Sequence, residues 1–304
     1  MTLWTAAVLT ALAAAAFHLA VRRGFRIPDR PETGSPADHA LPHRTVLIPT
    51  ARGRRLAGWH IPPHGDGPAP HVVVMHGWGA NAGDMLPLAV PLHRAGYGVL
   101  LVAARNHGRS DRDGVSSMPL FAEDLAHAHC WVEGRPEALP GRTALLGHSV
   151  GAAAAILAAA RLCRTPAVAA LASFRHPETV TRRFLELRGI PYRPLGWLVC
   201  RHVERVIGHR FDRIAPTTTA AELRCPVLLL HGAADTTTPP ADSAAIAAAV
   251  PPGLATVAVI PGVGHDTLDG LDAVTRAVLD FLAIHHPPTG DTPCPNPYAA
   301  VPST

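Results

Sequence analysis

The chain has 304 residues, of which 48% are hydrophobic and 16% charged. This is enough for one globular domain of about 240 residues with an extension at each end. Its positive charge comes entirely from arginine, because the sequence contains no lysine, and the formal net charge is +4. Without a lysine amine, Schiff-base enzymes and P-loop nucleotide hydrolases are excluded. The arginines are scattered among acidic residues, so nothing indicates nucleic-acid binding.

The first feature along the chain is an apolar run, Leu3 to Val21, which is followed by arginines at positions 22, 23, 26 and 30. A helix of this length, at about 1.5 Å per residue, would measure roughly 28 Å and could cross the hydrocarbon core of a bilayer. Residues 1–21 are therefore expected to be a single transmembrane helix, and the positive-inside rule places the following domain in the cytoplasm. A cleaved signal peptide is the competing interpretation, but its positive charge would precede the apolar run.

Residues 22–44 are rich in Pro, Asp, Gly and Arg and are expected to be a linker to one domain over residues 45–286. Apolar runs bounded by turn residues predict strands at 45–48, 56–61, 72–75, 99–103, 144–146, 168–172, 227–230 and 255–260. Helices are expected near 84–95, 121–133, 152–160 and 271–284. This alternation indicates an α/β fold with a mostly parallel central sheet flanked by helices. The proline-rich residues 287–304 are expected to be a disordered tail.

The most informative motif is Gly-His-Ser-Val-Gly at residues 147–151. It lies between a predicted strand and an alanine-rich helix, so Ser149 would occupy a sharp turn with its hydroxyl clear of the sheet. A serine hydroxyl needs a histidine to accept its proton and a carboxylate to orient that histidine. An ordinary strand-to-helix turn with sterically required glycines would give the same motif. A catalytic role for Ser149 therefore requires a histidine and a carboxylate elsewhere in the chain.

Two later loops supply the missing groups. The predicted strand that includes residues 227–230 runs into a loop that carries Asp235, and the strand 255–260 leads to a glycine-rich loop that carries His265. Carboxyl ends of parallel strands meet at one edge of a sheet, so these side chains are expected beside Ser149. Asp266 is a second candidate acid, but it adjoins His265 and would point away from it. Taken singly, Asp235 could be a turn residue and His265 a loop cap.

With its nucleophile, acid and base in this order, the chain resembles the α/β-hydrolase superfamily over most of residues 45–285. The resemblance implies that Ser149 is the nucleophile, Asp235 the acid and His265 the base. The segment His76-Gly77-Trp78-Gly79 is similar to the family's oxyanion segment, and the donors are assigned to the amides of Trp78 and Val150. Taken alone, His76 could equally be a hydrogen-bonded histidine at a strand end.

The stretch from Leu101 to Ser110 departs from the family pattern. Many relatives carry an aspartate before R-x-H-G-x-S, but here Ala103 stands in its place. The usual role of that aspartate is to support the loop, so its absence leaves the proposed triad intact. It also leaves Arg105 and Arg109 without an obvious nearby acid, for which Asp111 and Asp113 are the expected substitutes.

Residues 173–223 form an insertion that is expected to be a helical cap, broken at Gly189-Ile190-Pro191 and Arg193-Pro194. Its apolar residues could line an acyl pocket, but such spacing more often reflects packing on the core. They are Phe184, Leu185, Leu187, Leu195, Trp197, Leu198, Val199, Val203 and Val206. The cap also carries arginines that could contact anionic lipid head groups, namely Arg182, Arg183, Arg201, Arg205 and Arg210.

Five cysteines without paired spacing argue against a disulfide framework. His127, His129 and Cys130 lie in a predicted helix where positions two apart point in different directions, so neither a metal site nor a cofactor is expected. The sequence thus predicts a membrane-associated serine hydrolase of the esterase or lipase type that cleaves a small-molecule acyl ester. A peptidase or thioesterase of the same fold and a non-catalytic binding protein remain the alternatives.

Overall fold

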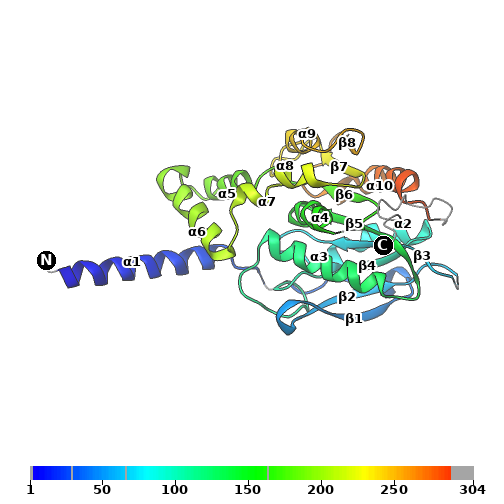
Figure 1. Cartoon of the computed structure of the whole chain (residues 1–304), viewed down its shortest axis with the longest axis horizontal. Helices are drawn as coiled ribbons and strands as arrows, with labels where there is room; N and C mark the ends of the chain where they lie inside the picture. The colour runs from blue at the N-terminus through cyan, green and yellow to red at the C-terminus, as the bar shows by residue number, and fades with distance from the viewer. Residues whose placement is uncertain (1–2, 29, 66, 163, 289–304) are drawn as a thin grey trace, which may run out of the picture.

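The computed structural model describes residues 3–28, 30–65, 67–162 and 164–288. Its centre is an eight-stranded sheet in the order β1-β2-β4-β3-β5-β6-β7-β8 (Figure 1). The strands are β1 (Arg44–Pro49), β2 (Arg55–Ile61), β3 (Ala69–Met75), β4 (Gly98–Val102), β5 (Ala138–His148), β6 (Val168–Leu171), β7 (Val227–Gly232) and β8 (Ala255–Ile260). Only the β1–β2 and β2–β4 pairs are antiparallel, which confirms the mostly parallel sheet.

The central strands are largely apolar because helices cover both faces of the sheet. All residues of β4 and β7 are buried, whereas β8, at the edge, leaves much of its surface exposed. One face carries α2 (Leu86–Arg94) and α10 (Leu271–His285). The other carries α3 (Met118–Glu133), α4 (Val150–Arg161) and α9 (Ala241–Ala247). The small alanine side chains of α4 allow it to pack closely against the sheet and α3.

Between β6 and β7 lies the helical insertion expected as a cap. It contains α5 (Pro177–Glu186), a short π-helical turn (Tyr192–Gly196), α6 (Trp197–Ile207), α7 (Phe211–Ile214) and α8 (Pro216–Thr219). The helices α5 and α6 project from the body of the protein on the same side as α1 (Figure 1). The expected breaks are present, since α5 ends before Gly189 and α6 begins after Pro194.

The N-terminal helix α1 runs from Leu3 to Gly24 and extends away from the domain (Figure 1). Its stretch Ala7–Gly24 is long and apolar enough to cross a membrane, and none of it is buried inside the protein. The helix continues into the first residues of the expected linker, which then contacts the domain. Ile27 and Leu41 are buried, and the Asn81 side chain donates to the carbonyl of Pro31 at 3.2 Å.

The boundaries expected for the transmembrane helix, linker, domain and cap stay predictions, and the expected disordered tail lies almost wholly outside the described residues.

Candidate active site

Ser149 occupies a strained turn between β5 and α4. Its backbone has φ 55° and ψ −116°, a region that side-chain-bearing residues rarely adopt. The flanking glycines are required by space, because a Cβ at Gly147 would collide with the carbonyl of Gly151 and a Cβ at Gly151 would collide with the carbonyl of His76. The turn is thus held by the close approach of strand and helix, and Ser149 is presented at the carboxyl edge of the sheet.

The structure brings the three residues of the sequence prediction into one hydrogen-bonded chain. Ser149 Oγ lies 3.1 Å from His265 Nε2, and His265 Nδ1 lies 2.8 Å from Asp235 Oδ2. Asp235 accepts hydrogen bonds from the amides of Thr237 and Thr238, both at 2.8 Å, and is buried. The contact with Asp235 selects that residue over Asp266 as the partner of His265.

Electrostatics keep Asp235 ionised. Burial by itself opposes ionisation, but hydrogen bonds from His231, His265 and the Thr238 amide outweigh it, so the pKa of Asp235 lies well below its ordinary value. An ionised carboxylate can only accept, so His265 Nδ1 carries the proton and donates it to Asp235. In the neutral ring, the other nitrogen, Nε2, can accept the hydrogen bond from Ser149 Oγ.

The two backbone amides expected to bind an oxyanion belong to residues that line the cavity beside Ser149. Val150 is the first residue of α4, so its N–H has no carbonyl partner one turn earlier in the helix. Gly77 approaches the serine so closely that a Cβ added there would lie 3.3 Å from Ser149 Cβ, and Trp78 follows it. Trp78, Ser149 and Val150 all line the same cavity. This placement agrees with the donors expected from the sequence, and their catalytic role stays a prediction.

Two buried histidines support the loop that carries Trp78. His76 Nδ1 donates to the Gly77 carbonyl at 2.7 Å, and its Nε2 accepts from the Ala104 amide at 3.1 Å. His107 Nε2 accepts from the Gly79 amide at 3.2 Å. Burial lowers the pKa of His76 to about 3 and that of His107 to about 4, so both are neutral. His76 is therefore a hydrogen-bonded structural histidine, one of the alternatives open from the sequence.

His148, the variable residue of the serine motif, was not singled out by the sequence. Its Nε2–H donates to the carbonyl of His265 at 2.9 Å, and the two rings lie 5.3 Å apart. Burial is the main cause that lowers the pKa of His148, so the neutral ring is favoured. The residue before the serine thus holds the loop that presents the histidine. Sequence spacing alone gives no signal for a contact across 117 positions.

The triad opens onto a cavity of about 440 Å³ whose lining is mainly apolar. The cap contributes Val180, Phe184, Val203, Val206 and Ile207. The helix α1 contributes Val21 and Arg22, and the turn that follows it contributes Phe25. No aspartate or glutamate is found among the described residues that line it. A cavity of this size and chemistry can bury an acyl group.

The apolar residues of the cap divide into three groups. Phe184, Val203 and Val206 line the cavity, and Leu185 and Val199 are buried in packing. The other four lie on the surface of the cap, namely Leu187, Leu195, Trp197 and Leu198. The sequence could not separate these groups, because spacing along a helix does not show what lies opposite each face.

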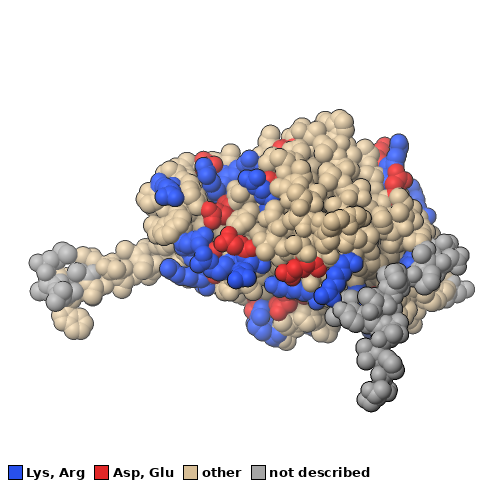
Figure 2. All heavy atoms as spheres, turned by 45° about the horizontal axis from the view of Figure 1, so that its top comes forward, with Lys and Arg blue, Asp and Glu red and all other residues tan. Residues whose placement is uncertain are grey.

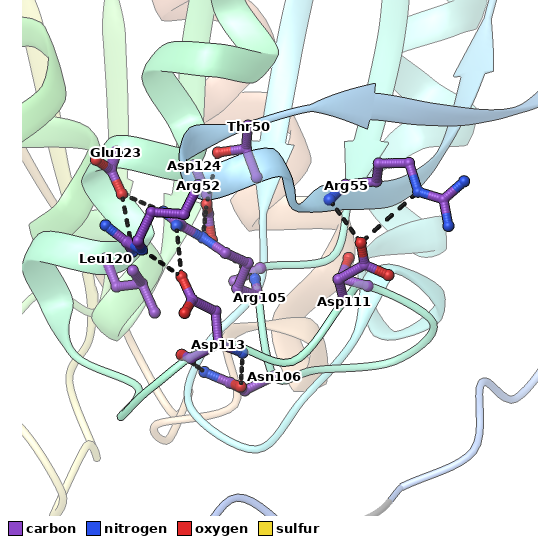
Figure 3. Close-up of polar contacts among 12 residues, drawn as sticks. Thr50, Arg52, Arg55, Arg105, Asn106, Asp111, Asp113, Leu120, Glu123 and Asp124 are labelled. Carbon is purple, nitrogen blue, oxygen red and sulfur yellow. Dashed lines mark hydrogen bonds and ion pairs between the residues drawn. The ribbon is translucent and has the colours of Figure 1, made fainter.

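Arg105 is fully buried and its partners correct part of the sequence interpretation (Figure 3). Its Nε donates to Asp124 of α3 at 2.6 Å, and its two terminal nitrogens contact Asp113 and Glu123. Asp113 therefore serves as expected. Asp111 does not, because it accepts from the backbone amide of Arg55 at 2.9 Å.

Arg109 also differs from the expectation, because its partner is Glu32 in the expected linker, at 2.7 Å. The carboxylates that pair with Arg105, in the absence of an aspartate at position 103, therefore come mainly from α3.

Among the residues that the structure describes, no group of His, Cys, Asp and Glu is arranged to hold a metal ion. His129 is buried, and its Nε2–H donates a hydrogen bond to the Thr143 carbonyl at 3.1 Å. Cys130, the next residue of the same helix, is exposed. Cys130 and Cys200 are free thiols.

Comparisons with known proteins agree with this fold. Residues 66–188 match the family model described as serine aminopeptidase, S33, and residues 200–294 match the model for TAP-like proteins. Two uncharacterized proteins of Mycobacterium tuberculosis, from strains CDC 1551 / Oshkosh and ATCC 25618 / H37Rv, are each 35% identical over 252 residues, which is 79% of this chain and 81% of theirs. The chain belongs to the α/β-hydrolase superfamily. The family models make it a hydrolase of this fold.

Solved structures of superfamily members have the same fold. An esterase of Pyrococcus furiosus aligns with a TM-score of 0.68 at 19% identity, over 86% of this chain and 97% of its own. Est1E from Butyrivibrio proteoclasticus aligns with a TM-score of 0.64 at 19% identity, over 79% and 98% of the two chains. At such identities the likeness supports the α/β-hydrolase fold alone. The reaction catalysed depends on this chain's own residues.

Proposed function

We propose that this α/β-hydrolase is a membrane-anchored serine hydrolase that cleaves carboxylic esters through an acyl-enzyme on Ser149. The observation that carries the proposal is the hydrogen-bonded chain from Ser149 through His265 to Asp235, which opens onto an apolar cavity. A nucleophile, a base and an orienting acid within hydrogen-bond distance are the set that acyl transfer requires.

The reaction follows from this geometry. His265 Nε2 takes the proton of Ser149 as the hydroxyl oxygen attacks the ester carbon, and the amides of Trp78 and Val150 donate to the oxyanion that forms. The imidazolium, stabilised by Asp235, then gives its proton to the departing alkoxide, which leaves as an alcohol. A water molecule, deprotonated by His265, attacks the acyl-enzyme and releases the carboxylic acid with regeneration of Ser149.

Labelling with a fluorophosphonate probe tests the nucleophile. The full chain in detergent should form a covalent adduct, and the S149A variant should not. Cys130→Ser, which changes an exposed nucleophile on α3, is the matched control and should label like the native chain. Equal labelling of the native and S149A proteins would refute the assignment, and absence of labelling in both would favour a non-catalytic binding protein.

The match to the serine aminopeptidase model favours a peptidase as the second candidate. A site that selects a free α-ammonium group is expected to offer it a carboxylate. The described lining residues include Arg22 but no acid, so the charge of the cavity speaks for an ester. Rates on p-nitrophenyl esters of graded acyl length, compared with those on aminoacyl p-nitroanilides, test this preference. Faster turnover of the anilides would replace the esterase proposal by the peptidase.

Membrane attachment and a cytoplasmic catalytic domain belong to the same proposal. They are supported by the exposed apolar stretch Ala7–Gly24 and the arginines that follow the apolar run. The chain should stay with membranes after a high-salt wash and dissolve in detergent. External protease should spare the domain in intact cells and digest it after lysis. Digestion without lysis would reverse the orientation, and recovery of a chain without α1 would indicate a cleaved signal peptide.

A further inference from the structure

The cap of the protein has an exposed apolar tip that no other part of the described chain covers. Its side chains follow α5 and begin α6, where Leu187 is 80% exposed, Leu195 49%, Trp197 45% and Leu198 43%. None of the four lines the cavity at Ser149. Four large apolar side chains gathered on one projection of a domain mark an interaction surface rather than a core.

The tip lies on the side of the protein from which α1 leaves (Figure 1). His18 Nδ1 of α1 is 2.9 Å from His202 Nε2 of α6, and the ring of Phe17 lies 5.2 Å from that of His202. One turn further along both helices, Arg22 and Val206 line the same cavity. The helix α6 therefore meets α1 at His18 and His202, and both helices lead from there toward the cavity.

This contact relates the position of the tip to that of α1. Trp197 precedes His202 by five residues, or about 7.5 Å of helix, toward the apolar half of α1. If α1 crosses a bilayer, as proposed above, Trp197 and Leu198 lie at the depth of the apolar residues that precede His18. The tip would then enter the boundary between head groups and acyl chains.

Both helices change from apolar to basic along their length. Along α1 the exposed Leu12 and Leu19 give way to the exposed Arg22 and Arg23, and along α6 the exposed Trp197 and Leu198 give way to the exposed Arg205. Figure 2 shows basic side chains, with some acidic ones among them, where the cap and the base of α1 meet. An apolar surface bordered by arginines is complementary to a leaflet that contains anionic phospholipid.

Two arginines at the tip are compatible with this position. Arg188 lies 3.5 Å from the centre of the Phe184 ring, and Arg193 is exposed in the π-helical turn. Long arginine side chains can reach the head groups while their carbon stems lie along apolar surface.

We propose that the cap tip, defined as Leu187, Leu195, Trp197 and Leu198, inserts into the same leaflet as the arginine-flanked end of α1. The cavity at Ser149, which is lined by Val21 and Arg22 of α1 and by Phe25 just after it, then opens at the bilayer surface. Its substrate is an acyl ester lipid that enters from the leaflet. The part of this inference that names the substrate rests on the proposed function, whereas insertion of the tip does not.

Fluorescence quenching tests the insertion without reference to catalysis. The full chain is reconstituted into vesicles of phosphatidylcholine and phosphatidylglycerol, with or without acyl chains brominated near the head group. Trp197→Phe should lower the fraction of tryptophan emission that the brominated lipid quenches. Trp131→Phe, which removes a half-buried tryptophan of α3, is the control and should not lower it. An unchanged quenched fraction in Trp197→Phe would overturn the inference. Concentration-dependent dimerisation abolished by that change would assign the tip to a second copy.

Kinetics test lipid entry. The double variant Leu187→Glu/Leu198→Glu would have to carry two carboxylates into the bilayer, which opposes insertion. Its hydrolysis of a vesicle-borne ester lipid should therefore fall about tenfold or more. Hydrolysis of a short water-soluble p-nitrophenyl ester should stay within about twofold, because neither leucine lines the cavity. Ile284→Glu, at a 73% exposed position on α10, is the matched control. Equal rates of the tip variant and the native chain on vesicles would overturn lipid entry, whereas inactivity of the native chain on both substrates would instead reject the proposed function.

Discussion

Acidification should destabilise this protein, because several histidines are buried as neutral rings. His60, His76, His107 and His286 are each at most 2% exposed. Burial is the largest cause that lowers their pKa values, to about 4 for His60 and His107 and about 3 for His76 and His286. In the unfolded chain each would titrate near its ordinary pKa of about 6.5. Between these values the unfolded chain binds more protons, so stability falls as pH falls.

The magnitude follows from proton linkage. Between pH 7.5 and 6.0 one histidine with an unfolded pKa of about 6.5 and a folded pKa of about 4 or less lowers the free energy of unfolding by about 0.8 kcal/mol. Four such groups lower it by about 3 kcal/mol, which corresponds to a fall in Tm of roughly 6–12 °C for a domain of this size. Asp235 does not contribute in this window, because a depressed carboxyl pKa removes stability only at more acidic pH.

Thermal denaturation of the full chain in a non-ionic detergent, followed by tryptophan fluorescence at pH 7.5 and 6.0, measures this difference. His76→Asn should reduce the pH-dependent part of the Tm shift by about a quarter, whatever it does to the absolute Tm. His39→Asn, at an exposed position, should leave the shift unchanged. The same Tm at both pH values would refute the reasoning, because it would mean that these rings accept protons in the folded state.

Two further changes test contacts that support the site. His148→Phe removes the hydrogen bond to the His265 carbonyl, so kcat on a soluble ester should fall about tenfold with little change in KM. An unaltered kcat would exclude this positioning role. Asp124→Asn leaves the buried Arg105 with weaker compensation and should cost about 3 kcal/mol, seen as a lower Tm. Glu137→Gln, which breaks an exposed pair with Arg44, should cost less than about 1 kcal/mol, and equal losses in the two variants would contradict the importance of burial.

Local patterns along the sequence determined much of this protein. Buried strands such as β7 read as continuous apolar runs because helices cover both faces of the sheet, and the order of Ser149, Asp235 and His265 followed from loops at the carboxyl ends of such strands. The expected strand 255–260 coincides with β8, and the glycines around Ser149 indicated a turn that needs close backbone contact. These features depend on residues near one another or on the general rule that parallel strands end at one edge.

Only the tertiary structure decided which distant groups meet. Asp124 of α3 became the partner of Arg105, His148 was joined to the His265 loop, and His202 of the cap was brought to His18 of α1. Each depends on how helices cross the sheet or lie beside one another, and many side chains of suitable chemistry compete for such contacts. Hydrophobic periodicity shows that a helix has an apolar face but not what that face touches, so the partners are settled by packing of the whole chain.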